Sequence, residues 1–504
     1  MKKEKMKTVD IEVNGRKYRY EDIPYWDKEK KQGRHKRNYI GRIEDGTNKV
    51  IASKNKIHNI KSRGYGAFHL LSAISEKTDL TEILKTKFSN RWEDILTLAF
   101  YELVERQPMY LCEQWSDDNI TFSNKIMYSS RISELLSSIT EQDKFSFFNS
   151  WTEKRIENEY VALDITSVSS YSQQLEQIEY GYNRDNEKLP QLNIAMLFGN
   201  SSELPILYNT HMGSVKDVKT LINILTLTEY ANLNKLRLIM DRGFYSKKNI
   251  TQMIREKIKF IIGIPFTLKY AKEQVVKNLE TITNAQNYIK VNKDIYFCTT
   301  EKVLFEGKKL TAHIFFNEQK YVDEKNIFLN ELIKAEDEIK SKTKDTINSE
   351  LKKYFTIKGK KRITISRNEE AIQDKIKYMG FFSLLSNTKE TSQRILEIYR
   401  RKELVENSFD DIKNELDMER LRIHNDATLH GKLFVIYISL ILKSHINKIM
   451  RENNLYRNYT IIELLKEVNK IKKVELNEKK CYLTDITSKH QKIYSAFGIE
   501  PPNI

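Results

Sequence analysis

Apolar residues between positions 64 and 155 recur every three or four residues, which is the period of a helix that buries one face. The pattern predicts helices at Ala67–Thr78, Leu80–Phe88, Trp92–Arg106 and Ser130–Ile139. We therefore expect a mainly helical region that ends near residue 156, where the pattern changes.

From residue 156 onward, short apolar runs replace the helical spacing and indicate strands. The predicted elements are strands at Tyr160–Ile165, Leu192–Phe198 and Leu204–Tyr208, a helix at Ser214–Tyr230, a strand at Leu236–Met240, a helix at Lys247–Lys257 and a strand at Phe260–Pro265. Apart from Arg237, the last two strands consist of apolar residues and Gly263, as in strands buried on both faces. Three antiparallel-type strands followed by a β-α-β unit predict a mixed α/β sheet.

Residues 267–370 interrupt this sheet in the sequence and are interpreted as a β-rich insertion domain. Its predicted elements are strands at Tyr288–Val291, Ile295–Thr299 and Leu310–Phe316 and a charged helix at Asn326–Lys342. A strand at Tyr378–Leu385 would return the chain to the sheet, followed by a long helix at Ser392–Leu416. The apolar run Leu433–Leu442 has half the ~20 residues of a membrane span and predicts a buried helix.

Charge is unevenly distributed along the 504 residues. The chain carries 85 Lys and Arg against 69 Asp and Glu, a net charge of +16. Residues 1–63 hold 19 of these basic residues and nine of the acidic ones, and their densest stretch includes Arg34, Lys36 and Arg37 among tyrosines and a tryptophan. Cations beside aromatic rings suit contact with DNA. A solvated basic surface without a ligand is the alternative.

The number of cysteines and the first residues of the chain argue against a secreted protein. The 3 Cys are far apart and form no CxxC pair, which excludes a disulfide framework and a thiolate zinc site and favours a reducing compartment. The opening MKKEKMKTVDIEVNG lacks the apolar core of a signal peptide. We expect a soluble intracellular protein that does not enter a membrane.

Two aspartates stand at the ends of predicted core strands, Asp164 in YVALDITS and Asp241 in LRLIMDRGFYS. Ligands of open α/β sheets bind at the carboxyl ends of the strands. Buried carboxylates that are neighbours there repel each other and are stabilised by a divalent cation between them. Oxygen ligands without a His or Cys cluster favour Mg²⁺ or Mn²⁺. For each aspartate alone, the alternative is a residue that caps the following turn.

The predicted long helix carries a polar stripe beside its apolar face. Four residues spaced by 3, 4 and 7 positions fall within about 60° of one another on the helix; they are Tyr399, Lys402, Glu406 and Lys413. A carboxylate there could supply the third metal ligand, with cations nearby for phosphate. Glu403 and Asp410 compete with Glu406 for that role, and an ordinary amphipathic helix is the alternative.

These segments resemble a DDE transposase of the bacterial IS4 group, closest to its IS1634-like members. The stripe Tyr399-x2-Lys402-x3-Glu406-x6-Lys413 is similar to the group's Tyr-Arg-Glu-Lys signature, with Lys in the Arg position, where bidentate phosphate binding is lost. DITSVSSYS (164–172) and MDRGFYS (240–246) are similar to the first and second Asp motifs. Residues 26–43, 180–197, 210–217 and 489–499 also resemble family segments, so the resemblance covers nearly the whole chain.

The resemblance implies an RNase H-like mixed-sheet catalytic core in which Asp164, Asp241 and Glu406 hold two Mg²⁺ ions, with Mn²⁺ able to substitute. Lys413, Tyr399 and Lys402 would contact DNA near the cleaved end, and Arg242 would neutralise a phosphate or form a salt bridge in the core. The expected partners are the terminal inverted repeats and the target DNA, bound by a homodimer in the synaptic complex. The expected location is the bacterial cytoplasm, in association with the nucleoid.

The expected division of the chain follows from these assignments. It comprises a basic DNA-contacting segment (1–63), a helical N-terminal region (64–155), a first core segment (156–266), the insertion domain (267–370), a second core segment with the Glu helix (371–450) and a C-terminal region (451–504). The first two together would form a mainly helical N-terminal DNA-binding region. Two other functions remain open at this point: a metal-dependent nuclease on the same fold, which only hydrolyses DNA, and a transposase-derived DNA-binding protein without catalysis.

Overall fold

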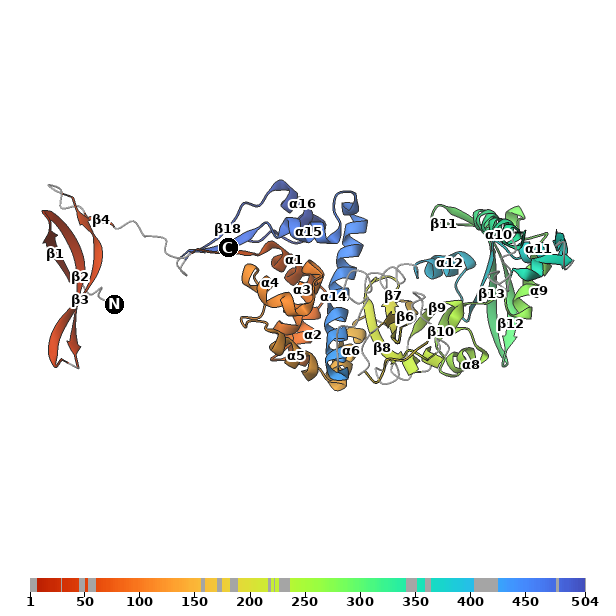
Figure 1. Ribbon diagram of the computed structural model, residues 1–504, viewed down its shortest axis with the longest axis horizontal. Coiled ribbons are helices and arrows are strands. Elements are labelled where there is room, and N and C mark those ends of the chain that lie inside the picture. The colour runs from red at the N-terminus through yellow and green to blue at the C-terminus, as the bar shows by residue number, and fades with distance from the viewer. Residues whose placement is uncertain are drawn as a thin grey trace. The chain divides into compact units, whose positions relative to one another are not determined.

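The structure is a computed structural model of the 504-residue chain. It describes residues 7–28, 30–44, 50–52, 60–155, 159–169, 175–181, 189–215, 219–221, 223–225, 236–340, 351–358, 364–402, 425–476 and 480–503. Glu406 and Lys413 of the predicted site, the competing Glu403 and Asp410, and most of the predicted helix at 214–230 lie outside these residues. The chain divides into two compact units, residues 1–62 with 473–484 and residues 63–472 with 485–503, which are described separately (Figure 1).

The basic N-terminal segment is a β-sheet. Its four strands pair antiparallel in chain order: β1 (Thr8–Val13), β2 (Arg16–Asp27), β3 (Gln32–Ile43) and β4 (Val50–Ala52). The expected helical character of the N-terminal DNA-binding region therefore does not extend to this segment. Its strands contain Tyr, Ile and Val, which favour extended backbone. The two longest strands, β2 and β3, lack the regular alternation of apolar and polar residues by which a half-buried strand is recognised. A three-stranded sheet is formed by β5 (Ile60–Gly64), β17 (Lys472–Leu476) and β18 (Lys480–Leu483).

The second unit begins with the predicted helical region. Its α-helices are α1 (Gly66–Lys77), α2 (Leu80–Phe88), α3 (Trp92–Glu105), α4 (Cys112–Asp118), α5 (Ser129–Ser138) and α6 (Glu141–Glu153). Four of them match the predicted ranges within two residues at either end. The sequence pattern missed α4 and α6. Thr140 caps α6 through a capping box with Asp143, a local signal that an apolar pattern does not reveal.

Helix α14 (Asp426–Glu452) runs through this helical region, with α15 (Ile461–Val468) and α16 (Ser488–Ala496) nearby (Figure 1). It is long and apolar enough to cross a membrane, but 78% of its apolar window is buried inside the structure. Phe434 packs edge-on against Phe147 of α6, and Tyr437 lies close to Phe148. The apolar run predicted as a buried helix is thus the centre of α14.

The rest of the second unit is built on a nine-stranded mixed sheet, which confirms the predicted α/β class. Its strands are β6 (Val161–Ser169), β7 (Gln191–Gly199), β8 (Pro205–Met212), β9 (Arg237–Met240), β10 (Lys259–Gly263), β11 (Tyr288–Val291), β12 (Asp294–Phe305), β13 (Lys308–Phe316) and β16 (Phe381–Ser386). The order across the sheet is β8-β7-β6-β9-β10-β16-β13-β12-β11. Strands β6, β9 and β10 run parallel to one another, and the other pairings are antiparallel.

The segment expected to be an insertion domain takes part in this same sheet. Its strands β11, β12 and β13 extend the sheet beyond β16. The remainder of the segment contains α9 (Lys269–Asn278), α10 (Glu318–Lys340), β14 (Phe355–Lys358) and β15 (Thr364–Arg367). Residues of α10 and of α11 (Glu369–Ile376) form a small separate core around Phe328, Leu332 and Ile372.

Candidate active site

The two predicted aspartates lie next to each other on neighbouring parallel strands. Leu163 of β6 is in register with Met240, the last residue of β9, so Asp164 on β6 lies beside Asp241, which directly follows β9. Parallel strands lie roughly 4.8 Å apart, so the two carboxylates are neighbours where β9 ends. Asp164 is not at the end of its own strand as predicted, because β6 continues to Ser169. The positions inferred from the two apolar runs are therefore adjacent in space although 76 residues separate them in the chain.

Both carboxylates belong to one face of the sheet. Leu163, Met240 and the β10 residue Ile262, which is in register with Met240, all contribute to the large apolar core on the other face. Side chains alternate along a strand, so the following residues Asp164, Asp241 and Gly263 form a row on the opposite face. The row ends in a glycine, which allows atoms of other residues to approach the backbone closely at this position.

The turn after β9 fixes Asp241. Its Oδ1 accepts a hydrogen bond from the backbone N–H of Arg242 at 2.7 Å, so the carboxylate caps the 3₁₀ turn Arg242–Phe244. Phe244 is buried under the sheet, and the side-chain amide of Asn249, on α8 (Lys247–Arg255), donates to the Phe244 carbonyl at 2.8 Å. Asp241 therefore does cap the following turn, which was the alternative to a ligand role. The same contact fixes the position of its carboxylate at the end of β9.

Tyr399 joins the row from a separate helix, α12 (Ser392–Arg400). Its hydroxyl donates to Oδ1 of Asp241 at 3.2 Å. The same hydroxyl would lie 3.2 Å from a Cβ built on Gly263, and the backbone nitrogen of Arg242 would lie 2.9 Å from it. Any side chain at position 263 would therefore push against both the Asp241 turn and Tyr399. Asn200 helps to place the helix, because its amide donates to the Ile398 carbonyl at 2.9 Å.

The other predicted residues near this edge have contrasting environments. Asp164 is 7% exposed, and its Oδ1 accepts from the backbone N–H of Ile165 at 2.9 Å. Lys402 follows α12 and is buried. Arg242 is exposed and forms no ion pair with the described residues, so the core salt bridge considered for it is not seen. Glu406 and Lys413 lie beyond the last described residue of this segment.

The oxygen atoms at this edge are of the kind that the implied Mg²⁺ ions prefer. Asp164 and Asp241 supply hard carboxylate oxygens, and both hydrogen bonds that the structure gives Asp241 fall on Oδ1. No group of three His, Cys, Asp or Glu side chains that could hold a metal occurs within the described ranges. The two aspartates therefore fit as part of a divalent-cation site whose predicted third carboxylate, Glu406, is outside these ranges.

The predicted DNA-contacting residues of the N-terminal segment are exposed on strand β3. The guanidinium of Arg34 lies 3.5 Å from Asp27, and that of Arg37 lies 3.3 Å from Asp22. Lys36 is exposed between them in sequence. These residues belong to the first unit, whereas Asp164 and Asp241 belong to the second.

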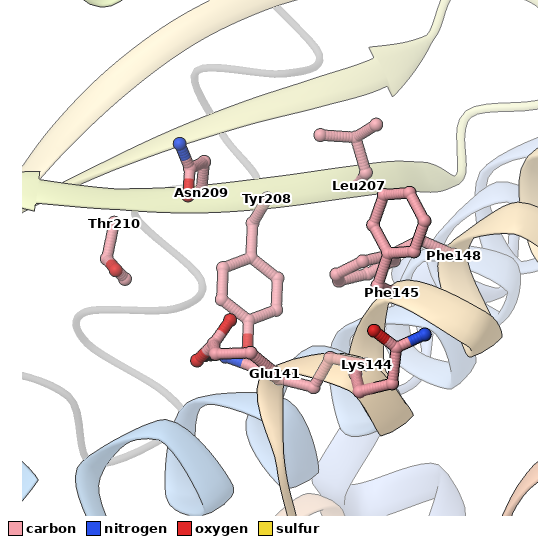
Figure 2. Close-up of a pocket in the computed structure, with 9 residues that line it drawn as sticks. Glu141, Lys144, Phe145, Phe148, Leu207, Tyr208, Asn209 and Thr210 are labelled. Atoms are coloured by element: carbon pink, nitrogen blue, oxygen red, sulfur yellow. Dashed lines mark ion pairs between the residues drawn. The ribbon is translucent and has the colours of Figure 1, made fainter. Parts of the chain in front are cut away.

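A pocket of about 270 Å³ opens on the face of the sheet that carries Asp164, between α6 and the edge strand β8 (Figure 2). Tyr208 extends from β8 toward Glu141 and Lys144, which form an ion pair at 2.5 Å. Burial raises the pKa of the Tyr208 phenol, and burial lowers the pKa of the Lys144 ammonium although Glu141 opposes the shift. The phenolic oxygen of Tyr208 has no hydrogen-bond partner among the residues that the structure describes.

Sequence reasoning did not find Gly263, Asn200 or Asn249. Gly263 ends an apolar run, and a glycine after a buried strand signals a close approach of other atoms only once its neighbours are known. The two asparagines form contacts across turns or between distant segments, for which the sequence carries no periodic pattern.

Comparison with known proteins places the chain in a family. Residues 157–442, more than half of the chain, match the sequence model of the family described as Transposase DDE domain. No curated protein matches the chain. A similar solved structure is that of the piggyBac transposase synaptic complex with hairpin DNA, with 9% sequence identity and a TM-score of 0.39; the match covers 75% of this chain and 69% of that chain. Similarity at this level says nothing about substrate or mechanism.

Proposed function

The chain belongs to the Transposase DDE domain family, and from this premise we propose that it cleaves the ends of its own insertion sequence and joins the freed 3′-OH ends to target DNA. Within the family, the signature around Tyr399 and the two Asp motifs favour the IS4 group and its IS1634-like members. The order β8-β7-β6-β9-β10, with three antiparallel strands followed by two parallel ones, supports an RNase H-like core.

One observation carries the proposal: Asp164 and Asp241 end up side by side at one edge of the sheet, with a helix bound to the second of them. An ordinary structural pair of aspartates at this spacing would repel, and each would favour a compensating cation. Carboxylate oxygens suit divalent metal ions, which DDE transposases generally use.

Asp164, Asp241 and Glu406 would hold two such ions, with Mg²⁺ the expected metal and Mn²⁺ able to replace it. When bound, the ions would activate the attacking water or 3′-hydroxyl and stabilise the leaving oxygen. The protein's own contribution is to fix the ligands. Tyr399 and the Arg242 N–H orient one oxygen of Asp241, and burial on β6 holds Asp164.

DNA would be bound by cations on both units. Arg34, Lys36 and Arg37 would contact phosphates through the N-terminal sheet, and Lys413 and Arg242 would contact the strand close to the carboxylates. Lys402 was also predicted to contact DNA, but its side chain is buried in the structure. The partners would be the terminal inverted repeats and target DNA. Bringing two ends together requires at least a homodimer during the reaction, which would take place in the bacterial cytoplasm at the nucleoid.

The test is a strand-transfer assay with the full chain, Mg²⁺ and labelled duplexes that carry the DNA flanking the coding region. Wild type should yield both cleaved ends and joined products. Asp164→Asn, Asp241→Asn and Glu406→Gln should each abolish both while DNA binding persists, because amides are poor substitutes for carboxylate ligands. Asp374→Asn, the same change at an exposed site on α11, should retain activity.

The assay separates the alternative functions. Cleaved but never joined products would identify a nuclease on the same fold and would contradict the transposase proposal. DNA binding without any metal-dependent cleavage, in wild type and variants alike, would identify a non-catalytic DNA-binding protein. Inverted repeats in the flanking DNA would support the proposal independently of the assay.

A further inference from the structure

The pairing of β2 with β3 continues beyond the rest of the N-terminal sheet. Strand β1 accompanies β2 only as far as Glu21, and β4 accompanies β3 only from Gly41 to Ile43. Within the described part of the chain, Ile23–Asp27 on one strand and Gln32–Lys36 on the other pair only with each other. We call these ten residues the ribbon. Five residues per strand make it roughly 17 Å long, with strands roughly 4.8 Å apart.

The ribbon exposes four consecutive nonpolar residues: Ile23, Pro24, Tyr25 and Trp26. Trp26 is 65% exposed and Tyr25 is 47% exposed. Trp26 pairs with Gly33, and nothing lies within 4 Å of a Cβ built there, so the residue opposite the indole has no side chain to cover it. A run of this kind is unfavourable in water and marks a surface that contacts something else.

Cations accompany the aromatic residues on both faces of the ribbon. The register places Tyr25 opposite Arg34 on one face, and alternation along β3 places Trp26 on the same face as Arg37, one residue beyond the ribbon. Residues 16–43, which form β2, β3 and their turn, contain ten Lys and Arg against four Asp and Glu. The aspartates at positions 22 and 27 pair with only part of this charge. The ribbon is therefore a narrow, two-faced surface with aromatic rings and a positive balance.

We propose that the ribbon enters the major groove of duplex DNA, with Tyr25 and Trp26 contacting the groove walls and base edges and the flanking cations contacting phosphates. The major groove, roughly 12 Å wide, admits a two-stranded β-ribbon without deformation of the duplex, whereas the minor groove, roughly 6 Å wide, would first have to be widened at an energetic cost. Double-stranded RNA is a poor occupant, because its major groove is too deep and narrow for side chains to read. An acidic protein could bind the basic residues, but it would not account for aromatic side chains on both faces of the ribbon.

The inference rests on the proposed function, since a transposase must recognise the ends of its element. It assigns recognition to the ribbon and assigns the chemistry to the carboxylates of the second unit. Loss of the aromatic residues should therefore lower affinity for DNA without altering the carboxylate site.

The first experiment measures DNA affinity of the full chain with labelled duplexes that tile the DNA flanking the coding region. Tyr25→Ala and Trp26→Ala should each weaken binding to the preferred duplex by about 10-fold or more, the scale of a lost base-edge contact. Tyr288→Ala, which removes another aromatic side chain with 63% exposure on β11, is the matched control and should bind as wild type. Since these side chains are exposed, thermal unfolding should be unchanged in all three variants.

The second experiment uses tryptophan fluorescence and dimethyl sulfate. Trp26 is the exposed indole, while Trp151 is fully buried and Trp92 and Trp115 are partly covered. Duplex DNA should protect wild type from acrylamide quenching, and Trp26→Phe should lose that protected component. Methylation at guanine N7, in the major groove, should be blocked by wild type and restored in Trp26→Ala.

The outcomes distinguish the two proposals. Wild-type affinity in both alanine variants, or protection confined to adenine N3 in the minor groove, would overturn the ribbon assignment. If Asp164→Asn still abolishes cleavage in that case, the proposed function stands alone. If the full chain binds none of the flanking duplexes above a random-sequence duplex and cleaves none, both proposals are wrong.

Discussion

Tyr399 and Asp241 are 158 positions apart, and the tyrosine hydroxyl donates to the aspartate Oδ1 at 3.2 Å. This contact ties α12 to the end of β9. Of the predicted polar stripe, Tyr399 lies near the end of α12 and contacts a proposed metal ligand directly, whereas Lys402 follows the end of this helix.

We expect Tyr399→Phe to lower the cleavage rate by about 10- to 100-fold, the range for a lost hydrogen bond to a charged group. The phenyl ring retains the packing but no longer orients Asp241. Because the defect would lie in ligand positioning, the Mg²⁺ concentration for half-maximal cleavage should rise as well. Tyr288→Phe, at an exposed site, is the control. An unchanged Mg²⁺ dependence would show that the hydroxyl does not position the ligand.

Gly263→Ala should also disturb the hydrogen bond between Tyr399 and Asp241. The added Cβ would meet the Arg242 nitrogen at 2.9 Å and the Tyr399 hydroxyl at 3.2 Å. We expect a loss of about 1–3 kcal/mol in unfolding free energy, the usual cost of overpacking, together with reduced cleavage. Gly33→Ala, which has open space around it, should unfold as wild type in the same denaturation experiment. Equal stability of the two variants would contradict the close approach at Gly263.

Two neighbouring tyrosines should respond in opposite ways to loss of their hydroxyls. Tyr208 and Tyr437 are both buried, with ring centroids 5.2 Å apart. The Tyr437 hydroxyl donates to the Pro205 carbonyl at 3.0 Å, whereas that of Tyr208 has no partner within the described ranges. Tyr437→Phe should therefore destabilise the fold by about 1 kcal/mol, and Tyr208→Phe should be neutral or stabilising by a similar amount. Melting temperatures of the two variants provide the comparison, and destabilisation by Tyr208→Phe would reveal a further contact of its hydroxyl.

Stability should fall in mildly acidic solution because of buried histidines. Burial, with Lys302 nearby, lowers the pKa of His313 from 6.5 to about 4, and its ring contacts the hydroxyls of Ser386 and Ser392. Between these values the unfolded chain binds a proton that the folded chain does not, so stability decreases as pH falls from 6.5 toward 4 and this contribution levels off below. His313→Gln should flatten that part of the profile in denaturant titrations. An unaltered profile would assign the pH dependence to other groups, such as His445, whose pKa burial also lowers to about 4.

The apolar runs of the sequence located the strands that carry Asp164 and Asp241, because strands covered on both faces require continuous hydrophobic residues. The same reasoning could not locate Gly263 beside Tyr399, since a contact between distant segments depends on how the sheet is assembled. The N-terminal sheet was missed for a different reason. The ribbon buries little, so Ile23, Tyr25 and Trp26 lack the alternation with polar residues that marks a half-buried strand.

Strand β16 shows that the apolar pattern of a strand does not predict its neighbours in the sheet. Its apolar sequence predicted a strand that rejoins the sheet, and it pairs with β10. Nothing in that sequence indicated that β13 would pair along its other side. Backbone hydrogen bonds are available on both edges of every strand, so hydrophobicity predicts that a strand is buried but not which neighbours it has.

Strand β16 pairs with β10 on one side and with β13 on the other. The segment between β10 and β16 therefore cannot be deleted without changing the sheet. A shortened chain that lacks β11, β12 and β13 would expose an unpaired, apolar strand edge in the sheet that carries the proposed site. Such edges recruit strands from other molecules, so truncated copies of this protein should aggregate instead of folding as smaller transposases. Members of the family with shorter chains would need a different way to close the sheet at this position.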